Sequence, residues 1–209
     1  MDKYTVVRTR VANLYRKASF KSELITQALN KEKLLILKKV DNWYKVKQWD
    51  GYESWIHNFY IDEERCVDNF LFNDFKVYDF SVNKFIKYAK SFLNVPYLWG
   101  GKSSLGFDCS GLVQTVLKVC GYDIPRDSYQ QRDFLMDYKI ELKKTDPGDL
   151  HFFGRKGKTT HVAFSTGGLG ILHSQGKVKK ESLGPGDDFN KNLLDLYISS
   201  HSIRRKFDK

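Results

Sequence analysis

The chain has 209 residues, of which 41% are hydrophobic and 15% are aromatic. A chain of this length and composition can bury one large core or two small ones, and it is neither disordered nor fibrous. The formal net charge is +10, but basic and acidic residues lie side by side, as in residues 31–33 and 62–65. This spread is typical of a solvated surface. Because no nucleic-acid-binding signature accompanies it, we expect no nucleic-acid partner.

The start of the chain is charged throughout, and nowhere do about 18 uncharged apolar residues follow one another. We therefore expect neither an export signal nor contact with a membrane, and we predict a cytoplasmic protein. The three cysteines lack Cys-x-x-Cys spacing, which fits a reducing compartment and argues against a metal site. Nothing in the sequence indicates a cofactor or an obligate protein partner.

The first block, residues 1–62, is predicted to be a small all-β domain. Short runs rich in β-branched and aromatic residues alternate with turn residues, which is typical of strands joined by tight turns. Residues 43–47 alternate between apolar and polar positions, as a strand with one buried face does. Residues 63–80 have no clear period, and we interpret them as a linker. The expected strands are residues 4–7, 34–40, 43–48 and 52–56.

The second block, residues 81–209, is predicted to be an α+β domain. Apolar residues recur every three or four positions between Ser81, a candidate N-cap, and Asn94, which indicates a helix. A second helix is predicted from about Cys109 to Gly121, where glycine supplies a C-terminal stop. Helices followed by strands define the α+β class. The expected strands are residues 150–153, 161–164 and 171–174.

Cys109 is the candidate nucleophile. At the first turn of a helix, unpaired backbone N–H groups and the positive end of the helix dipole favour a thiolate. The small neighbours Ser110 and Gly111 leave the sulfur approachable, so we expect Cys109 to react faster with alkylating reagents than free cysteine does. Cys120 lies about 16 Å further along the helix, and we expect it to pack in the core without bonding to Cys109.

Two histidines provide a candidate base and its partner. If the chain reverses around Gly167, His161 and His173 lie directly opposite each other on one face of an antiparallel pair. Together with Cys109 they would form a Cys-His-His relay, in which His161 transfers the proton and His173 orients the ring of His161. His151 is the competing candidate, and we interpret it as a packing or surface residue.

Six segments carry a family signature. They are Pro96–Gly101, Phe107–Gln114, Pro125–Ser128 with Gln130-Gln131, Pro147–Leu150, His161-Val162 and His173. Their set and order resemble the NlpC family of papain-like cell-wall cysteine peptidases. The resemblance covers about residues 80–207 and implies that Cys109, His161 and His173 are the catalytic triad. It also implies that Tyr97 lines the site and forms an oxyanion hole with the backbone N–H of Cys109.

The first block is similar to the bacterial SH3-type domain of γ-D-glutamyl-L-diamino acid endopeptidases, also called dipeptidyl-peptidase VI, over residues 11–16, 22–29 and 50–55. The resemblance implies that a small barrel precedes the catalytic domain, closes one end of its cleft and recognises the free amine of an N-terminal L-alanine. An ammonium removed from water needs a charged acceptor, for which Glu23 is the candidate. The candidate substrate-binding residues are Glu23, Tyr52, Trp55, Asp108, Ser110, Asp127 and Ser128.

Each assignment has a structural alternative: Glu23 as a solvated loop residue, Ser128 as a helix N-cap, and Tyr52 and Trp55 as core. The resemblance implies a cysteine endopeptidase that cleaves the γ-D-glutamyl–diamino acid bond of peptidoglycan stem tripeptides and tetrapeptides with a free N-terminal L-Ala. It would release L-Ala-γ-D-Glu and serve murein peptide recycling. Two alternatives stay open, namely a noncatalytic peptidoglycan-binding protein and an acyltransferase on the same scaffold.

Overall fold

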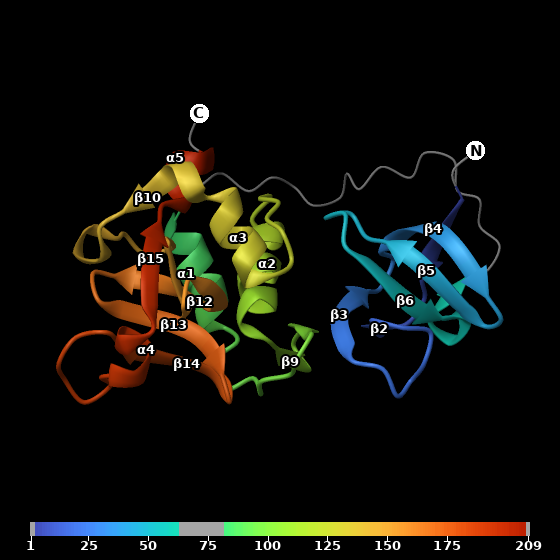
Figure 1. Cartoon of the computed structure of the whole chain (residues 1–209), viewed down its shortest axis with the longest axis horizontal. Helices are drawn as coiled ribbons and strands as arrows, with labels where there is room; N and C mark the ends of the chain where they lie inside the picture. Colours follow the sequence, from blue (N-terminus) through green and yellow to red (C-terminus); the bar gives the residue numbers. More distant parts are fainter. Residues whose placement is uncertain (1–2, 63–81, 208–209) are drawn as a thin grey trace.

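The computed structural model describes residues 3–62 and 82–207, which form an all-β unit and an α+β unit (Figure 1). The all-β unit is a seven-stranded sheet in the order β3-β2-β6-β5-β4-β1-β7. The predicted linker, residues 63–80, and Cys66 lie outside the described residues. The strands are β1 (Tyr4–Val7), β2 (Val11–Tyr15), β3 (Leu24–Leu29), β4 (Lys33–Val40), β5 (Trp43–Lys47), β6 (Glu53–His57) and β7 (Ile61–Asp62), with a short 3-10 helix at Asn58–Tyr60.

The four strands predicted for this unit correspond to β1, β4, β5 and β6 with ends that agree within one residue. In β5 the buried residues Tyr44 and Val46 alternate with half-exposed ones, which confirms the predicted one-sided burial. The predicted strands do not include β3, because its buried residues Thr26 and Gln27 are polar. Both side chains hydrogen-bond to the second unit, so a strand that is buried against another domain lacks the usual alternation.

The α+β unit contains a six-stranded sheet in the order β10-β15-β11-β12-β13-β14 and a two-stranded ribbon of β8 and β9. The central strands β11, β12 and β13 contain the three predicted strands. The strands are β8 (Lys102–Ser103), β9 (Gly106–Phe107), β10 (Lys139–Ile140), β11 (Leu150–Arg155), β12 (Lys158–Gly167), β13 (Gly170–Gln175), β14 (Lys177–Ser182) and β15 (Tyr197–His201). The helices are α1 (Val82–Lys90), α2 (Cys109–Val119), α3 (Ser128–Phe134), α4 (Lys191–Asp195) and α5 (Ile203–Phe207), with 3-10 turns at Met136–Tyr138 and Leu142–Lys144.

Helix α2 packs its apolar stripe against α1 and against strands β12 and β13. It begins at Cys109, as predicted, and ends before Gly121, which has a positive φ of 88°. Such a left-handed residue after a helix favours glycine. Cys120 is a buried thiol within the same core, in agreement with the prediction.

Helix α1 is shorter than predicted. It ends at Lys90, and residues 91–93 form turns in which each N–H bonds to the carbonyl three residues earlier. Asn94 has a φ of 69° and donates its N–H to the carbonyl of Val178 in β14. The apolar spacing continues to Leu93 because these turn residues still pack on the core, so periodicity alone places the helix end too late.

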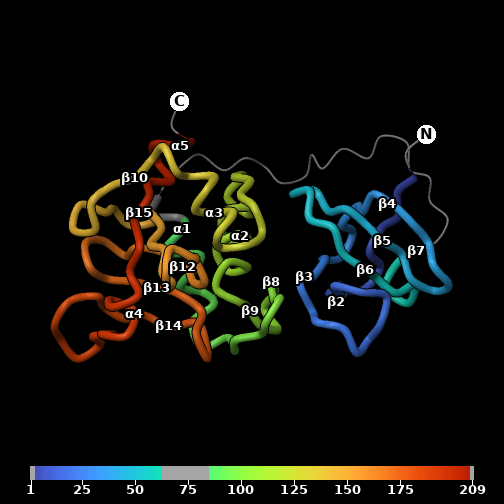
Figure 2. The backbone as a smooth tube through the Cα atoms, in the orientation of Figure 1, coloured from blue at the N-terminus to red at the C-terminus, as the bar shows by residue number. Residues whose placement is uncertain are grey.

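The two units meet where β3 lies beside β8 (Figure 2). Lys102 donates its backbone N–H to Oε1 of Gln27 at 3.0 Å. In α2, Nε2 of Gln114 donates to a carboxylate oxygen of Asp50, in the turn after β5, at 2.7 Å. These bonds place the first sheet next to the start of α2, where Cys109 lies.

His151 is fully buried in β11, with Nδ1 at 2.8 Å from the hydroxyl of Ser200, so it is a packing residue. Burial lowers the pKa of His151 to about 4. Because the folded-state pKa lies below the unfolded value of about 6.5, the unfolded state binds the proton first as the pH falls. The contribution of His151 to stability is therefore complete above about pH 6.5 and is lost as the pH approaches 4.

We expect the free energy of unfolding to fall between about pH 7.5 and about pH 5, and the variant His151→Leu to reduce that fall by about 2 kcal/mol. Urea unfolding at both pH values measures this difference. The variant Ser200→Ala serves as the control, since it removes the hydroxyl partner but keeps the buried imidazole. Equal pH dependence in His151→Leu and the wild type would contradict the assignment.

Candidate active site

Cys109 is the first residue of α2 and follows strand β9 after one residue. Asp108 precedes it in an extended conformation (φ −83°, ψ 176°) and caps the helix, because its Oδ1 accepts the backbone N–H of Gly111 at 2.6 Å. The surrounding chain is closely packed, since a Cβ on Gly111 would overlap the carbonyl of Gly101. The cap and this close approach together fix the position of Cys109.

The carboxylate of Asp108 forms a buried ion pair with Arg126, whose side chain is 1% exposed. Arg126 donates from Nη1 to Oδ1 at 3.0 Å and from Nη2 to Oδ2 at 2.6 Å. Its Nε donates to Oγ1 of Thr26 in the first sheet at 3.1 Å. Asp108 also accepts the N–H of Gly100 and the hydroxyl of Ser110. Because these donors engage both oxygens, Asp108 anchors the helix start, and its direct contact with substrate stays a prediction.

The sulfur of Cys109 lies close to β12. Strands β12 and β13 pair from their connecting turn as far as Phe164 and Leu172. Two residues further along β12, the backbone N–H of Val162 hydrogen-bonds to the sulfur. Cys109 is only 8% exposed, so its sulfur is less accessible than the sequence predicts. It is nevertheless adjacent to the backbone of the residue that follows His161.

The resting site holds a neutral thiol and a neutral imidazole. Burial and the Asp108 carboxylate raise the pKa of Cys109 to about 12, although the N–H groups of Val162 and Ser110 oppose them. Burial, with a smaller contribution from His173, lowers the pKa of His161 to about 3. The predicted thiolate is not the favoured resting form, because Asp108 already occupies the helix N-terminus and burial disfavours charge.

His161 and His173 contact each other, with Nε2 of His161 at 2.9 Å from Nδ1 of His173. They lie on the same face, as predicted, but the predicted register is wrong. Phe164 pairs with Leu172, and continuing this register places Ala163 rather than His161 opposite His173. The difference arises because the chain reverses between Gly167 and Gly170, which pair with each other, rather than around Gly167. The histidines are therefore diagonal neighbours, a distance that long side chains span.

The other nitrogen of His173 contacts a residue outside the predicted site. Nε2 of His173 lies 2.9 Å from Oε2 of Glu181 in β14. The sequence of β14, KVKKES, is that of an ordinary charged strand, so nothing in the sequence marks Glu181 as part of the site.

Tyr97 lies near Cys109 and Asp108, on the segment that leads into β8. Burial and the neighbouring Cys109 raise the pKa of the Tyr97 phenol to about 12. The hydroxyl therefore stays protonated at neutral pH and is available as a hydrogen-bond donor.

Glu23, at the start of the first sheet's strand β3, is engaged by residues from both units. It accepts hydrogen bonds from Nε of Arg16 at 2.6 Å and from Nε1 of Trp99 at 3.0 Å. Arg16 lowers the pKa of Glu23, so the carboxylate is ionised. Gly100, which follows Trp99, has a φ of 75° and lies against Leu24, where a Cβ would have no room. The family signature contains Trp99, but its contact with Glu23 is visible only in the structure.

Tyr52 and Asp127 form a second contact between the units that involves a carboxylate, after that of Glu23 with Trp99. The hydroxyl of Tyr52 lies 3.1 Å from Oδ2 of Asp127. Burial raises the pKa of Asp127, while Arg126 opposes that shift. Arg16 interacts electrostatically with both Tyr52 and Asp127. Arg16 therefore contacts Glu23 and interacts electrostatically with Asp127, although the two carboxylates belong to different units.

The remaining candidate substrate-binding residues lie in several different elements. Asp127 is the N-cap of α3 and Ser128 is its first residue, so the alternative of Ser128 as the N-cap is wrong. Ser110 accepts a hydrogen bond from Arg126 at 3.1 Å. Trp55 lies within β6, opposite Tyr15 and Lys45 of the same sheet. The roles of Ser110, Ser128 and Trp55 in substrate binding stay predictions.

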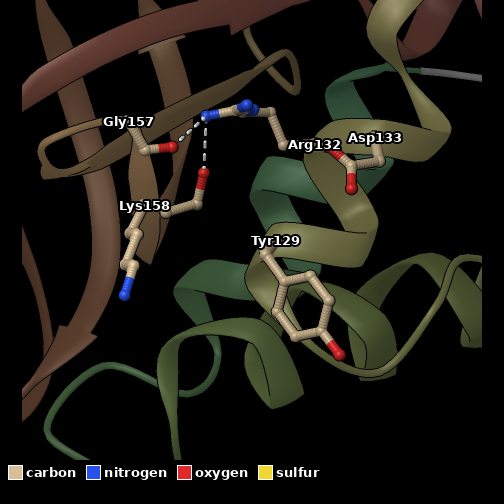
Figure 3. A pocket seen from close by; sticks show the side chains of 6 residues that line it. Tyr129, Arg132, Asp133, Gly157 and Lys158 are labelled. Carbon is tan, nitrogen blue, oxygen red and sulfur yellow. Dashed lines mark hydrogen bonds between the residues drawn. The ribbon is translucent and has the colours of Figure 1, made fainter.

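A pocket of about 340 Å³ lies between α3 and the turn that joins β11 to β12 (Figure 3). Arg132 crosses it and donates to the carbonyl of Gly157 and to Oγ1 of Thr159. None of the residues that line it belongs to the candidate site. The lining residues are Tyr129, Arg132, Asp133, Gly157, Lys158 and Thr159.

Within residues 3–62 and 82–207, no group of three His, Cys, Asp or Glu side chains is arranged to hold a metal ion. Every helix in these ranges is too short or too polar to span a bilayer.

The fold combines an SH3-like all-β unit with a papain-like α+β unit, in which a cysteine starts a helix that packs on the sheet. The chain belongs to the NlpC/P60 family, which residues 94–194 match, and residues 10–62 match the bacterial SH3 domain. The resemblance found in the sequence is confirmed by these matches.

Three related proteins show how similar this chain is to known sequences and structures. The gamma-D-glutamyl-L-lysine dipeptidyl-peptidase of Bacillus subtilis is 44% identical over 86 residues, which are 40% of this chain and 28% of that protein. An NlpC/P60 family protein from Bacillus cereus has a TM-score of 0.56 at 25% identity, over 96% of this chain and 63% of that one. The NlpC/p60 domain of the peptidoglycan hydrolase SagA has a TM-score of 0.50 at 30% identity, over 59% of this chain and all of that one. The chain spans less than a third of the first curated relatives.

We expect Arg126→Met to lower the free energy of unfolding by about 3 kcal/mol or more, because it leaves the buried Asp108 carboxylate without its counter-charge. Denaturant unfolding measures the change. Lys144→Met is the matched control, since the ion pair of Lys144 with Glu141 is exposed on both sides, and its loss should cost less than about 1 kcal/mol. Equal effects of the two variants would contradict the role of the buried pair.

We expect iodoacetamide to alkylate Cys109 near pH 7 more slowly than it alkylates free cysteine, with a rate that rises as the pH increases. The raised pKa leaves little thiolate in the resting protein. Mass spectrometry of the Cys109 peptide follows this residue separately from the other cysteines. A fast rate that is constant above pH 7 would instead indicate a preformed ion pair with His161.

Proposed function

We propose that this chain is a cysteine peptidase that hydrolyses the γ-D-glutamyl–diamino acid bond of peptidoglycan stem peptides. The observation that carries the proposal is the hydrogen-bonded pair of His161 and His173, together with the hydrogen bond that the backbone of Val162, the residue after His161, makes to the sulfur of Cys109. A thiol next to an oriented imidazole is the arrangement of a nucleophile and its base. Similarity to the gamma-D-glutamyl-L-lysine dipeptidyl-peptidase of Bacillus subtilis supports this substrate class.

In the proposed reaction, His161 removes the proton from Cys109 as the sulfur attacks the γ-carbonyl carbon of D-glutamate. Because both groups are neutral at rest, proton transfer accompanies the attack. His173 keeps the ring of His161 in place. The C–N bond then breaks, the leaving amine takes the proton from His161, and a γ-thioester remains on Cys109.

The hydroxyl of Tyr97 and the backbone N–H of Cys109 would stabilise the oxyanion of each tetrahedral intermediate. In the second half of the reaction, water gives a proton to His161 while its oxygen attacks the thioester. The C–S bond breaks, the sulfur recovers the proton, and L-Ala-γ-D-Glu leaves.

We assign recognition of the free L-alanine amine to the acidic end of the site, formed by Glu23 and Asp127. Tyr52 holds Asp127, and Trp99 and Arg16 hold Glu23. An ammonium that leaves water needs charged acceptors, and a second carboxylate offsets the guanidinium already present. In this assignment Ser110, Ser128 and Trp55 line the remainder of the pocket.

A requirement for a free amine rejects stems whose alanine is amidated to muramic acid. The proposed substrates are therefore released tripeptides and tetrapeptides, and the proposed role is recycling of wall peptides. An acyltransferase would use the same cysteine and histidines but pass the acyl group to an acceptor other than water, and a noncatalytic binding protein would release no product. The identity of the product distinguishes all three.

We expect the protein to release L-Ala-γ-D-Glu from L-Ala-γ-D-Glu-diamino acid tripeptides, and Cys109→Ala to release none. Acetylation of the alanine amine should lower kcat/KM about tenfold to hundredfold, because a charge-assisted hydrogen bond is lost. Mass spectrometry of the products measures both rates.

Glu23→Gln should raise KM for the free tripeptide and leave the acetylated one unchanged. Glu53→Gln is the matched control, because Glu53 is a carboxylate of the same sheet with the same 40% side-chain exposure and lysine partners. Equal rates on the free and acetylated tripeptides would overturn the amine assignment.

A further inference from the structure

Glu181 continues the chain of hydrogen bonds beyond the two histidines. It lies in β14, next to β13, and its Oε2 is 2.9 Å from Nε2 of His173. The side chain of His173 is fully buried and that of Glu181 is one-fifth exposed. The contacts therefore run from His161 through His173 to Glu181 and cross the three neighbouring strands β12, β13 and β14.

The position of Glu181 is set by two further donors. Nζ of Lys179 donates to Oε1 at 2.8 Å, and Nδ2 of Asn190 donates to Oε2 at 2.7 Å. Asn190 is itself fixed as the N-cap of α4, where its Oδ1 accepts the N–H of Leu193. Burial alone would raise the pKa of Glu181, but the hydrogen bonds from Lys179, Asn190 and His173 outweigh it and lower the pKa, so the carboxylate is ionised.

An ionised carboxylate can only accept hydrogen bonds. The proton between Glu181 and His173 therefore belongs to Nε2 of His173, which leaves Nδ1 of His173 as an acceptor. His161 must then donate from its Nε2, since the contact between the rings joins these two atoms. A neutral imidazole carries one proton, so Nδ1 of His161 is left unprotonated and serves as the base.

We propose that Glu181 is a positioning residue that sets the tautomers of both histidines and so creates the base that deprotonates Cys109. Its negative charge also stabilises the imidazolium that forms on His161 during attack, as the carboxylate of a serine-protease triad does. Lys179 reduces this charge effect without competing for Oε2. The inference rests on the proposed function for its catalytic consequence, but the tautomers follow from the contacts alone.

Two substitutions separate the acceptor from the charge. Glu181→Gln keeps an oxygen that can accept from His173 but removes the negative charge. Glu181→Leu removes both. We expect kcat to fall about tenfold in the first variant and about a hundredfold in the second, with KM within about twofold of the wild type. Glu141→Gln is the control, since Glu141 is an exposed carboxylate with a lysine partner elsewhere in the same unit.

Nitrogen-15 NMR of the imidazoles tests the tautomers directly. In the wild type at neutral pH, we expect His161 and His173 each to be protonated on Nε2 and bare on Nδ1. Glu181→Gln should retain this pattern, and Glu181→Leu should populate the other tautomer of His161.

The proposal is overturned if Nδ1 of His161 carries the proton in the wild type. It is also overturned if Glu181→Leu, with native circular dichroism, leaves both the tautomers and kcat unchanged. Because the NMR measurement needs no substrate, a wild type that cleaves no tripeptide but shows the expected tautomers would refute the proposed function and support the role of Glu181.

Discussion

The buried ion pair of Asp108 and Arg126 joins three parts of the molecule. Asp108 caps α2 and so places Cys109, while Arg126 precedes the cap of α3 and reaches Thr26 of the first sheet. A paired charge with saturated hydrogen bonds has one favourable geometry, so the nucleophile and the contact between the units are positioned together.

This arrangement disfavours the thiolate form of Cys109. The same burial that shields the ion pair from water also surrounds Cys109 and His161, and it disfavours their charged forms. The site is therefore organised by fixed dipoles and hydrogen bonds rather than by a stored thiolate. In the proposed reaction, charge appears only when the substrate is attacked, and the oriented hydrogen-bonding groups would then stabilise it.

The sequence predicts the positions of the helices and strands better than the register between neighbouring strands. Apolar spacing locates α1 and α2, and β-branched runs locate the central strands, because these signals depend on each element's own core face. The register of His161 and His173 was predicted wrongly because the chain reverses between Gly167 and Gly170 rather than around Gly167, and several neighbouring glycines do not show which of them form the turn. Glu181 was missed because its contacts are with His173 in the adjacent strand and with Asn190 from a later loop, which no local sequence pattern shows.

Glu23 and Tyr52 are encoded in the first unit, whereas Cys109 and both histidines are encoded in the second. A recombination event that exchanged the N-terminal module would therefore replace Glu23 and Tyr52 of the proposed amine site and leave Cys109, His161 and His173 unchanged. The contacts of β3 with Lys102 and Arg126 define which replacement modules could dock. If the proposed amine site is correct, selectivity and chemistry in this architecture can diverge at different rates during evolution.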